Sequence, residues 1–236
     1  MSNPRLSIII LCYRSNERII PFAEEVKNLG LNLTENLEII LVGNYIEGTK
    51  DNTQDIVERL SRDNKVFKAI CKPKKGMMGW DMKSGLEKAS GDIICVIDGD
   101  SQFPSNTISK CYHYLLTQNY GLVKTYRETR EDGFYRKMIS KVYNRLFKLL
   151  FPGINSKDIN SKPKMFTREV LNKMELTSDD WFIDAEIMLN VHKLNVSFFE
   201  FPTTFKELHG RSSFVKFSAI LEFLRNLLIF KLRGLK

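Results

Sequence analysis

Short apolar runs alternate with segments of helical periodicity along the first half of the chain. Four apolar runs predict buried strands, at residues 6–13, 38–42, 66–71 and 92–97. The segments between them predict a helix at 17–29, a second that starts at 51–53 with Asp51 as its cap, and a third at 80–89. Strands that alternate with helices in this way predict an α/β fold, with a mostly parallel sheet covered by helices on both faces.

The second half of the chain is less regular. We expect helices near 105–117, at 134–151, at 179–193 and over 214–235. Strands are expected around 121–125 and at 196–201, the second ended by Pro202, with a loop at 158–164 between them. Because no internal repeat or low-complexity linker interrupts the chain, we expect one domain over 1–213 and a basic amphipathic helix at 214–236.

Two of these helical segments combine an apolar side with basic residues. At 134–151 the expected apolar face holds Tyr135, Met138, Ile139, Val142, Tyr143, Leu146, Leu149 and Leu150. The opposite face holds Arg136, Lys137, Lys141, Arg145 and Lys148. This pattern suits either a membrane surface or a core-packing helix with a solvated basic face. At 227–236 the apolar end has no obvious core to join, which favours contact with a membrane or a partner.

Charge and composition narrow the partners. Of the net charge of +8, residues 124–148 contribute +5 and residues 206–236 another +5, so the rest of the chain sums to about −2. Anionic partners are expected at these two segments, and nucleic acid ranks low because no nucleic-acid motif is present. The four cysteines show no metal-ligand spacing, and Cys12 and Cys95, which lie in the apolar runs, read as buried free thiols; a reducing cytoplasm fits. Residues 6–13 run into charged positions and read as a first strand rather than as a signal peptide.

Asp98-Gly99-Asp100 follows the apolar run at 92–97. Two carboxylates two residues apart, at the carboxyl end of a strand, can share one Mg²⁺ or Mn²⁺, which takes its other ligands from water and a phosphorylated substrate. Ligands of parallel α/β sheets bind at that edge. The motif therefore predicts an enzyme that handles a nucleotide diphosphate, although such an acidic pair is elsewhere a plain surface turn.

A series of motifs accompanies this acidic pair in a fixed order. The series comprises Ser7–Glu17, Gly48–Thr53, Gly76–Gly79, Ser84–Asp92, Ile97–Pro104, Asp158–Lys164, Trp181–Glu186, Glu200–Pro202 and Gly210–Ser213. In this order they resemble the family 2 glycosyltransferases of the GT-A fold, especially those that load sugars onto polyprenyl phosphates. The resemblance implies a Rossmann-like sheet with a nucleotide-binding half at 1–104 and an acceptor half at 105–213.

The resemblance also implies roles for particular residues. The donor, a nucleotide-diphosphate sugar, would be bound by Tyr13, Glu17, Asp51, Gly76, Asp98, Gly99, Asp100 and Ser212, with Asp98 and Asp100 on the metal. The usual Asp-Asp-Gly-Ser is replaced by Gly43-Asn44-Tyr45-Ile46, which leaves Glu47 as one candidate to read the base. Arg127, Arg130 and Arg211 are further candidates for clamping phosphate, and each reads equally well as a solvated surface charge. Lys162 and Lys164 could contact an acceptor phosphate, with the same alternative. Arg211 or Lys206 would replace the phosphate-holding arginine that the family often has before its Gly-x-Ser element.

The acceptor implied by the resemblance is a polyprenyl phosphate or a glycan. A hydroxyl acceptor needs a general base, for which Asp158, Asp180, Asp184 and Glu186 are candidates; Asp180 and Asp184 would share a helix face. Asp179 reads equally well as a helix cap. A lipid phosphate is already anionic and needs little help from a base. We therefore expect an inverting, metal-dependent glycosyltransferase in the cytoplasm, or peripheral on the cytoplasmic membrane face.

Two other functions stay open from the sequence. A sugar nucleotidyltransferase shares a nucleotide-binding α/β sheet, but it favours a Gly-rich phosphate loop after the first strand, and residues 12–17 contain no glycine. A non-catalytic binding protein on a transferase fold is supported by the altered 43–46 segment. Retention of both Asp98 and Asp100 argues against it.

Overall fold

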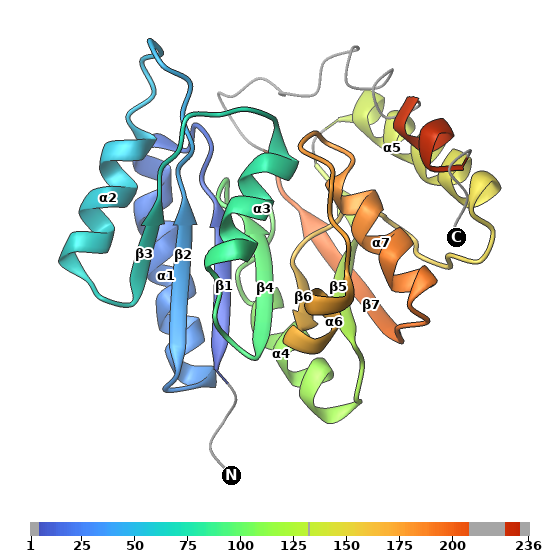
Figure 1. Ribbon diagram of the computed structural model, residues 1–236, viewed down its shortest axis with the longest axis horizontal. Coiled ribbons are helices and arrows are strands. Elements are labelled where there is room, and N and C mark those ends of the chain that lie inside the picture. The colour runs from blue at the N-terminus through green and yellow to red at the C-terminus, as the bar shows by residue number, and fades with distance from the viewer. Residues whose placement is uncertain (1–4, 132, 208–224, 232–236) are drawn as a thin grey trace.

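The computed structural model describes residues 5–131, 133–207 and 225–231. Within them a seven-stranded sheet has the order β3-β2-β1-β4-β6-β5-β7 (Figure 1). The strands are β1 Leu6–Leu11, β2 Leu37–Val42, β3 Phe67–Ile70, β4 Ile93–Asp98, β5 Leu122–Arg130, β6 Lys164–Thr167 and β7 Phe198–Phe205. Only β6 runs antiparallel to its neighbours in this described sheet. The expected mostly parallel sheet is confirmed.

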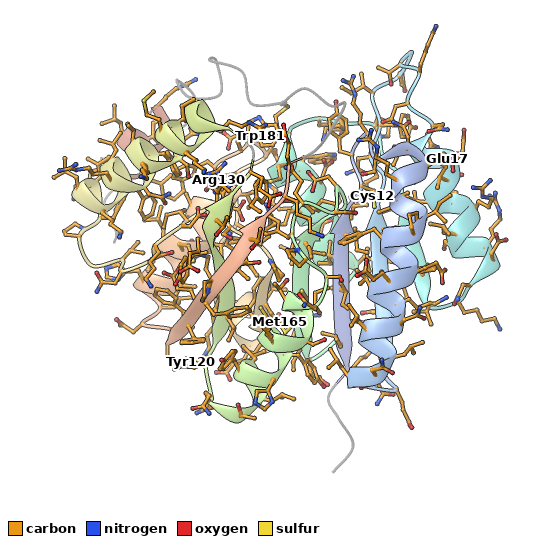
Figure 2. All side chains as sticks on the ribbon, turned by 180° about the vertical axis from the view of Figure 1, so that it is seen from behind. Cys12, Glu17, Tyr120, Arg130, Met165 and Trp181 are labelled. Carbon is orange, nitrogen blue, oxygen red and sulfur yellow. The ribbon has the colours of Figure 1, made fainter. Side chains whose placement is uncertain are left out.

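Helices cover both faces of the sheet. They are α1 Ile19–Leu33, α2 Thr53–Asp63, α3 Met78–Lys88, α4 Thr107–Thr117, α5 Phe134–Leu150, α6 Arg168–Lys173 and α7 Ile183–Lys193, with a 3-10 turn at Asn16–Arg18. Residues 225–231 are also helical. Figure 1 shows α3, α6 and α7 over one face, and Figure 2, seen from behind, shows α1 and α4 over the other.

The core has two parts, one on each face of the sheet. Ile8 and Ile10 of β1 belong to the part covered by α1, α2 and α4, whereas Ile9 and Leu11 belong to the part beneath α3 and α7. Successive side chains of a strand point to opposite faces, so a strand buried on both sides is apolar along most of its length. This is why β1, β2 and β4 could be predicted from the sequence, although they contain Ser7, Glu38 and Asp98.

The carboxyl ends of the parallel strands meet at one edge of the sheet. Leu11 pairs with Val42 of β2 on one side and with Asp98 of β4 on the other. Because β6 is antiparallel to β4, with Lys164 opposite Val96, the residues that precede β6 reach the same edge. Figure 2 shows Cys12, which follows β1, and Arg130 of β5 toward this edge, and Tyr120 toward the opposite one. The fold thus places the acidic pair and the start of β6 at the same edge of the sheet.

Three expectations about the second half are wrong, and one strand was not predicted. The loop expected at 158–164 is present up to residue 163, and the unpredicted β6 begins at Lys164, with α6 directly after it. β5 continues to Arg130, and Pro202 lies inside β7, whose edge position tolerates a residue without an N–H. α7 begins at Ile183 rather than at residue 179, so neither Asp179 nor Asp180 is inside it. The position of β6, the length of β5 and the place of Pro202 all depend on strand pairing, which is a long-range interaction.

The apolar face expected on α5 is only partly buried. Phe147 is fully buried, while Met138, Val142 and Leu149 of that face are 46%, 62% and 76% exposed. The apolar face of α5 is wider than the area that packs against the rest of the domain, so one side of that face stays exposed to solvent.

The helical residues 225–231 dock on the domain, so the expectation that this segment has no core to join is wrong for them. Leu227 is buried in the core, and the rings of Phe230 and Phe182 are 4.9 Å apart. Lys231 Nζ donates to Leu150 O at 2.8 Å. Residues 214–224 and 232–236 of the expected C-terminal helix lie outside the described residues.

Candidate active site

Asp98 and Asp100 lie at the end of β4, where the chain turns. The side chain of Asp98 is 27% exposed, and Gly99 N donates to Leu11 O at 2.9 Å. A Cβ on Gly99 would lie 2.9 Å from the same oxygen, so glycine allows β1 and this turn to approach. Gln102 N donates to Asp100 Oδ1 at 3.2 Å, with Ser101 at a φ of 61°. The turn holds two carboxylates at an accessible edge.

These carboxylates fit a divalent cation that is shared with a substrate. Among the described residues, no group of three or more His, Cys, Asp or Glu side chains gathers as a metal site. Asp98 and Asp100 would therefore supply two oxygen ligands, and water and a diphosphate the others, which is the manner in which Mg²⁺ is usually held.

A buried charge cluster adjoins Asp98. Lys162 Nζ lies 3.3 Å from Asp98 Oδ1 and 2.9 Å from Asp184 Oδ2, and Lys164 Nζ lies 2.5 Å from Asp184 Oδ1. Burial alone would raise the pKa of Asp184, but the two ammonium groups outweigh it and hold that pKa below its usual value. Burial lowers the pKa of Lys164 to about 7 despite Asp184. Both lysines, which the sequence offered as contacts for an acceptor phosphate, are buried and paired with Asp184.

The other acidic candidates are also engaged. Glu186 is buried and accepts hydrogen bonds from Thr177 N at 2.9 Å and Ser178 N at 2.9 Å. Asp180 accepts from Phe182 N at 2.8 Å and from Asn226 Nδ2 at 2.6 Å. Since Asp180 precedes α7, the expectation that Asp180 and Asp184 share a helix face is wrong. Asp180 and Glu186 instead accept hydrogen bonds from backbone N–H groups that lie just before α7.

Asp158 is paired with Arg127. Arg127 Nε lies 2.6 Å from Asp158 Oδ2, and its Nη2 lies 2.8 Å from Oδ1. Burial would raise the pKa of Asp158, but the Arg127 guanidinium holds it well below its usual range. The four carboxylates proposed as bases are thus all held by cations or by hydrogen-bond donors.

Residues proposed for the nucleotide are spread over the same edge. Tyr13 follows β1, and Lys74 Nζ lies 4.1 Å from the centroid of its ring. Asp51 accepts from Thr53 Oγ1 at 2.6 Å, and Asn16 N donates to the same hydroxyl at 2.9 Å, which joins the loops after β1 and β2. The helix begins at Thr53 with Asn52 as its N-cap, one residue later than expected.

Two proposed nucleotide ligands lie apart from the buried residues of this edge. The carboxylate of Glu17 is 65% exposed and 4.0 Å from Arg59 Nη2. Glu47 lies in an exposed loop. Arg211 and Ser212 lie outside the described residues.

A buried polar group that the sequence reasoning missed follows β2. Asn44 Nδ2 donates to Asp81 Oδ1 at 2.9 Å, Lys72 N donates to Asn44 Oδ1 at 2.9 Å, and Lys74 forms an ion pair with Asp81. Burial raises the pKa of Asp81 despite Lys74 and Asn44. The signal in the sequence was an aspartate at a core position of the 80–89 helix. Asn44 belongs to the Gly43–Ile46 segment, which departs from the Asp-Asp-Gly-Ser implied by the resemblance.

Gly76 and Gly79 bring the turn before α3 against the segment before α7. Met77 N donates to Asp179 O at 2.7 Å, Trp80 N to the same oxygen at 3.1 Å, and Gly79 N to Asp180 O at 2.9 Å. A Cβ on Gly76 would lie 2.6 Å from Asp179 O. Gly76 therefore serves a close backbone approach within the protein.

A basic cavity of about 610 Å³ lies between β5 and α5. Its basic lining residues are Arg127 and Arg130 of β5, Lys137, Lys141, Arg145 and Lys148 of α5, and Lys157. Its acidic lining residues are Glu128 and the already paired Asp158. Lys162, beside Asp98, follows Asp158 by four positions, a span of at most about 14 Å. The basic excess at 124–148 is thus concentrated in a cavity near the acidic pair.

None of the described helices combines the length and apolar composition needed to cross a membrane.

Curated proteins and solved structures resemble this chain. It is 28% identical over 144 residues to the undecaprenyl-phosphate 4-deoxy-4-formamido-L-arabinose transferase of Proteus mirabilis (strain HI4320), which covers 60% of this chain and 43% of the relative. It is 25% identical over 170 residues to the protein of that name from Pseudomonas syringae pv. syringae (strain B728a), covering 72% of this chain and 49% of the relative. The chain spans about half the length of these relatives.

The fold matches a solved structure of low sequence identity. Glucosyl-3-phosphoglycerate synthase from Mycobacterium tuberculosis, in complex with Mn²⁺, uridine-diphosphate-glucose and phosphoglyceric acid, aligns with a TM-score of 0.75 at 15% identity. The alignment covers 96% of this chain and 79% of that one. The GT-A fold implied by the motifs is confirmed.

The family model described as "Glycosyl transferase family 2" matches residues 7–175. It includes the acidic pair and most of the motifs on which the resemblance was based. The chain therefore belongs to glycosyl transferase family 2.

Proposed function

We propose that the protein transfers a sugar, with inversion, from a nucleotide-diphosphate sugar to a polyprenyl phosphate. In this proposal, residues 1–104 bind the nucleotide and residues 105–213 receive the acceptor. The relatives named for undecaprenyl phosphate support the acceptor class. The four free cysteines agree with a site on the cytoplasmic face of a membrane.

The donor is assigned to the edge of the sheet where Asp98 and Asp100 lie. A divalent cation, Mg²⁺ or Mn²⁺, bound there with the donor would stabilise the leaving diphosphate as a Lewis acid. Tyr13 lies after β1 at the same edge, and the Asn44–Asp81 pair follows β2. These groups are our candidates for the surroundings of the nucleotide base, in place of the exposed Glu47.

One observation favours a phosphate acceptor over a hydroxyl. Asp184, Asp158, Asp180 and Glu186, the proposed bases, are all held by lysine, arginine or hydrogen-bond donors. A base must be able to take a proton from the acceptor. A phosphate oxygen carries its charge already, and the basic cavity between β5 and α5 suits it.

The proposed reaction is a single displacement. A phosphate oxygen of the acceptor attacks the anomeric carbon, and the bond from that carbon to the donor diphosphate breaks. The electron pair leaves with the diphosphate, so no proton is transferred. The residues of this chain bind and orient the two anions.

A membrane surface is our proposal for the place of the reaction. Met138, Val142 and Leu149 are spaced by four and seven residues, which places them on one side of α5. Lys141 and Lys148 line the cavity beside them. An exposed apolar ridge next to a basic cavity suits an anionic bilayer from which a lipid phosphate is taken.

The proposal is tested by transfer assays with the purified protein. Nucleotide sugars are supplied with Mg²⁺ or Mn²⁺ and with a polyprenyl phosphate, a polyprenol or a glycan as acceptor. We expect transfer to the phosphate alone, lost in Asp100→Ala. Lys141→Ala with Arg145→Ala should raise the KM for the lipid at least tenfold and leave the KM for the donor unchanged.

Lys110→Ala, an exposed lysine of α4 on the other face of the sheet, is the matched control and should behave as wild type. Transfer to a polyprenol or glycan hydroxyl at an equal rate would contradict the phosphate proposal.

A further inference from the structure

Lys162 places a buried positive charge directly beside the proposed metal ligand Asp98. Its Nζ lies 3.3 Å from Asp98 Oδ1 and 2.9 Å from Asp184 Oδ2, and the residue is 2% exposed. We propose that Lys162 weakens the binding of a free divalent cation at Asp98 and thereby couples cation binding to the arrival of the nucleotide diphosphate. This inference rests on the proposed metal role of Asp98 and Asp100.

The position of Lys162 is fixed by the structure around it. Its backbone oxygen accepts from Thr125 Oγ1 at 2.5 Å, which holds the chain just before β6. Its Nζ also approaches Met78 Sδ, a weak acceptor, at 3.2 Å. The side chain is buried, and its ammonium group contacts Asp98 of β4, Met78 of α3 and Asp184 of α7. The charge therefore stays beside Asp98.

A positive charge already faces Asp98 before a cation binds. The carboxylates of Asp98 and Asp184 face the ammonium groups of Lys162 and Lys164. The usual reason for a carboxylate pair to bind a dication is unpaired negative charge, and here Lys162 already neutralises part of it. Repulsion between an ammonium group and a nearby dication is strong where water is scarce.

A diphosphate changes this balance. It brings two or more negative charges and its own oxygen ligands to the cation, so the cation and the diphosphate can enter together where the cation alone binds poorly. Lys162 would then face the anionic complex instead of a bare dication. The expected behaviour is strong mutual dependence between Mn²⁺ and the nucleotide, with reciprocal effects on their affinities.

The test measures Mn²⁺ affinity directly, without any reaction. The dissociation constant of Mn²⁺ is obtained from the paramagnetic resonance signal of the free ion, with and without uridine diphosphate or guanosine diphosphate. We expect the wild type to bind Mn²⁺ at least tenfold more tightly with one of these nucleotides. Lys162→Gln keeps a hydrogen-bond donor but removes the charge, and should bind Mn²⁺ alone at least tenfold more tightly than wild type.

Two variants serve as controls. Lys164→Gln removes the other ammonium group on Asp184, which has no direct contact with Asp98 among the described interactions, and should change Mn²⁺ affinity less than threefold. Lys162→Arg keeps the charge and should bind Mn²⁺ no more tightly than wild type. Thermal unfolding establishes that each variant is folded.

Several outcomes would overturn the inference. They are an unchanged Mn²⁺ affinity in Lys162→Gln, an equally large gain in Lys164→Gln, or a gain in Lys162→Arg. If Lys162→Gln does not fold, the wild-type protein provides the test. Equal Mn²⁺ affinity of the wild type with and without nucleotide would then overturn the inference. Absence of Mn²⁺ binding with every nucleotide would instead overturn the proposed metal role itself, and the inference with it.

Discussion

Arg127 and Asp158 form a two-point ion pair at the wall of the basic cavity, with nitrogen–oxygen distances of 2.6 and 2.8 Å. The pair joins β5 to the segment that leads to Lys162. Because Asp158 is 5% exposed, its removal would leave the Arg127 guanidinium in a poorly solvated place without its counter-ion.

We predict that Asp158→Asn lowers the free energy of unfolding by about 3 kcal/mol, the usual loss when one partner of a buried pair is removed. Chemical denaturation at pH 7 measures the change. Glu128→Gln, an exposed carboxylate on the same cavity, is the control and should lie within about 0.5 kcal/mol of wild type. A loss in Asp158→Asn no larger than in this control would mean that the ion pair does not stabilise the fold.

Asp180→Asn tests whether a base takes part in the reaction. The amide oxygen can still accept from Phe182 N, so the start of α7 should be kept. With a phosphate acceptor we predict a change in kcat of less than about threefold, whereas loss of a general base costs about a hundredfold or more. The measurement is the steady-state rate at saturating donor and lipid phosphate, from pH 5 to pH 9. A hundredfold fall would restore Asp180 as a base.

Glu38 should make stability depend on pH at the edge of the sheet opposite to the site. Burial alone would raise the pKa of Glu38, but Lys68, Ser7 and Ser90 lower it to about 2. A carboxylate with a lowered pKa stabilises the fold above its unfolded pKa of about 4.3, and this contribution is lost as the pH falls toward 2.

We therefore predict that wild type and Glu38→Gln differ in unfolding free energy by about 2–3 kcal/mol at pH 7, and that the difference shrinks steadily between pH 5 and pH 2. Denaturant titrations across this range measure it. Transfer activity of the folded variant should equal that of wild type, because Glu38 is remote from Asp98. A difference that persists at pH 2 would show that charge is not its source.

Val142→Glu tests the membrane surface. A carboxylate on the exposed ridge of α5 should reduce binding to anionic vesicles at least fivefold, through lost apolar contact and added repulsion. Vesicle flotation at low and high salt measures it. Leu116→Glu on α4, whose leucine is 46% exposed, is the matched control and should bind as wild type. Equal losses in the two variants would refute a specific surface on α5.

The sequence was sufficient for the parts of the fold that follow local rules. β1, apart from Ser7, and β4, up to Asp98 at its end, are apolar because both of their faces are buried. The family motifs supplied the order of the elements. β6 was missed because it has four residues, begins with a lysine and depends on pairing with β4 and β5, which no local pattern encodes.

Only part of the candidate site could be predicted from the sequence. The acidic pair could be predicted, since its position at a strand end is a local fact. The state of Asp184 could not, because it depends on two lysines brought by β6 from about twenty residues earlier in the chain. The cavity likewise requires that the basic side of α5 faces β5, which periodicity alone leaves undetermined.

The turn at residues 76–79 has a mechanical consequence. Three backbone hydrogen bonds and two glycines lock it onto Ser178–Asp180, across the line between the two halves of the domain. Such a joint resists hinge rotation along that line. If the proposed function holds, substrate entry and release would then depend on surface loops and on the proposed membrane surface, and not on rotation between the two proposed halves.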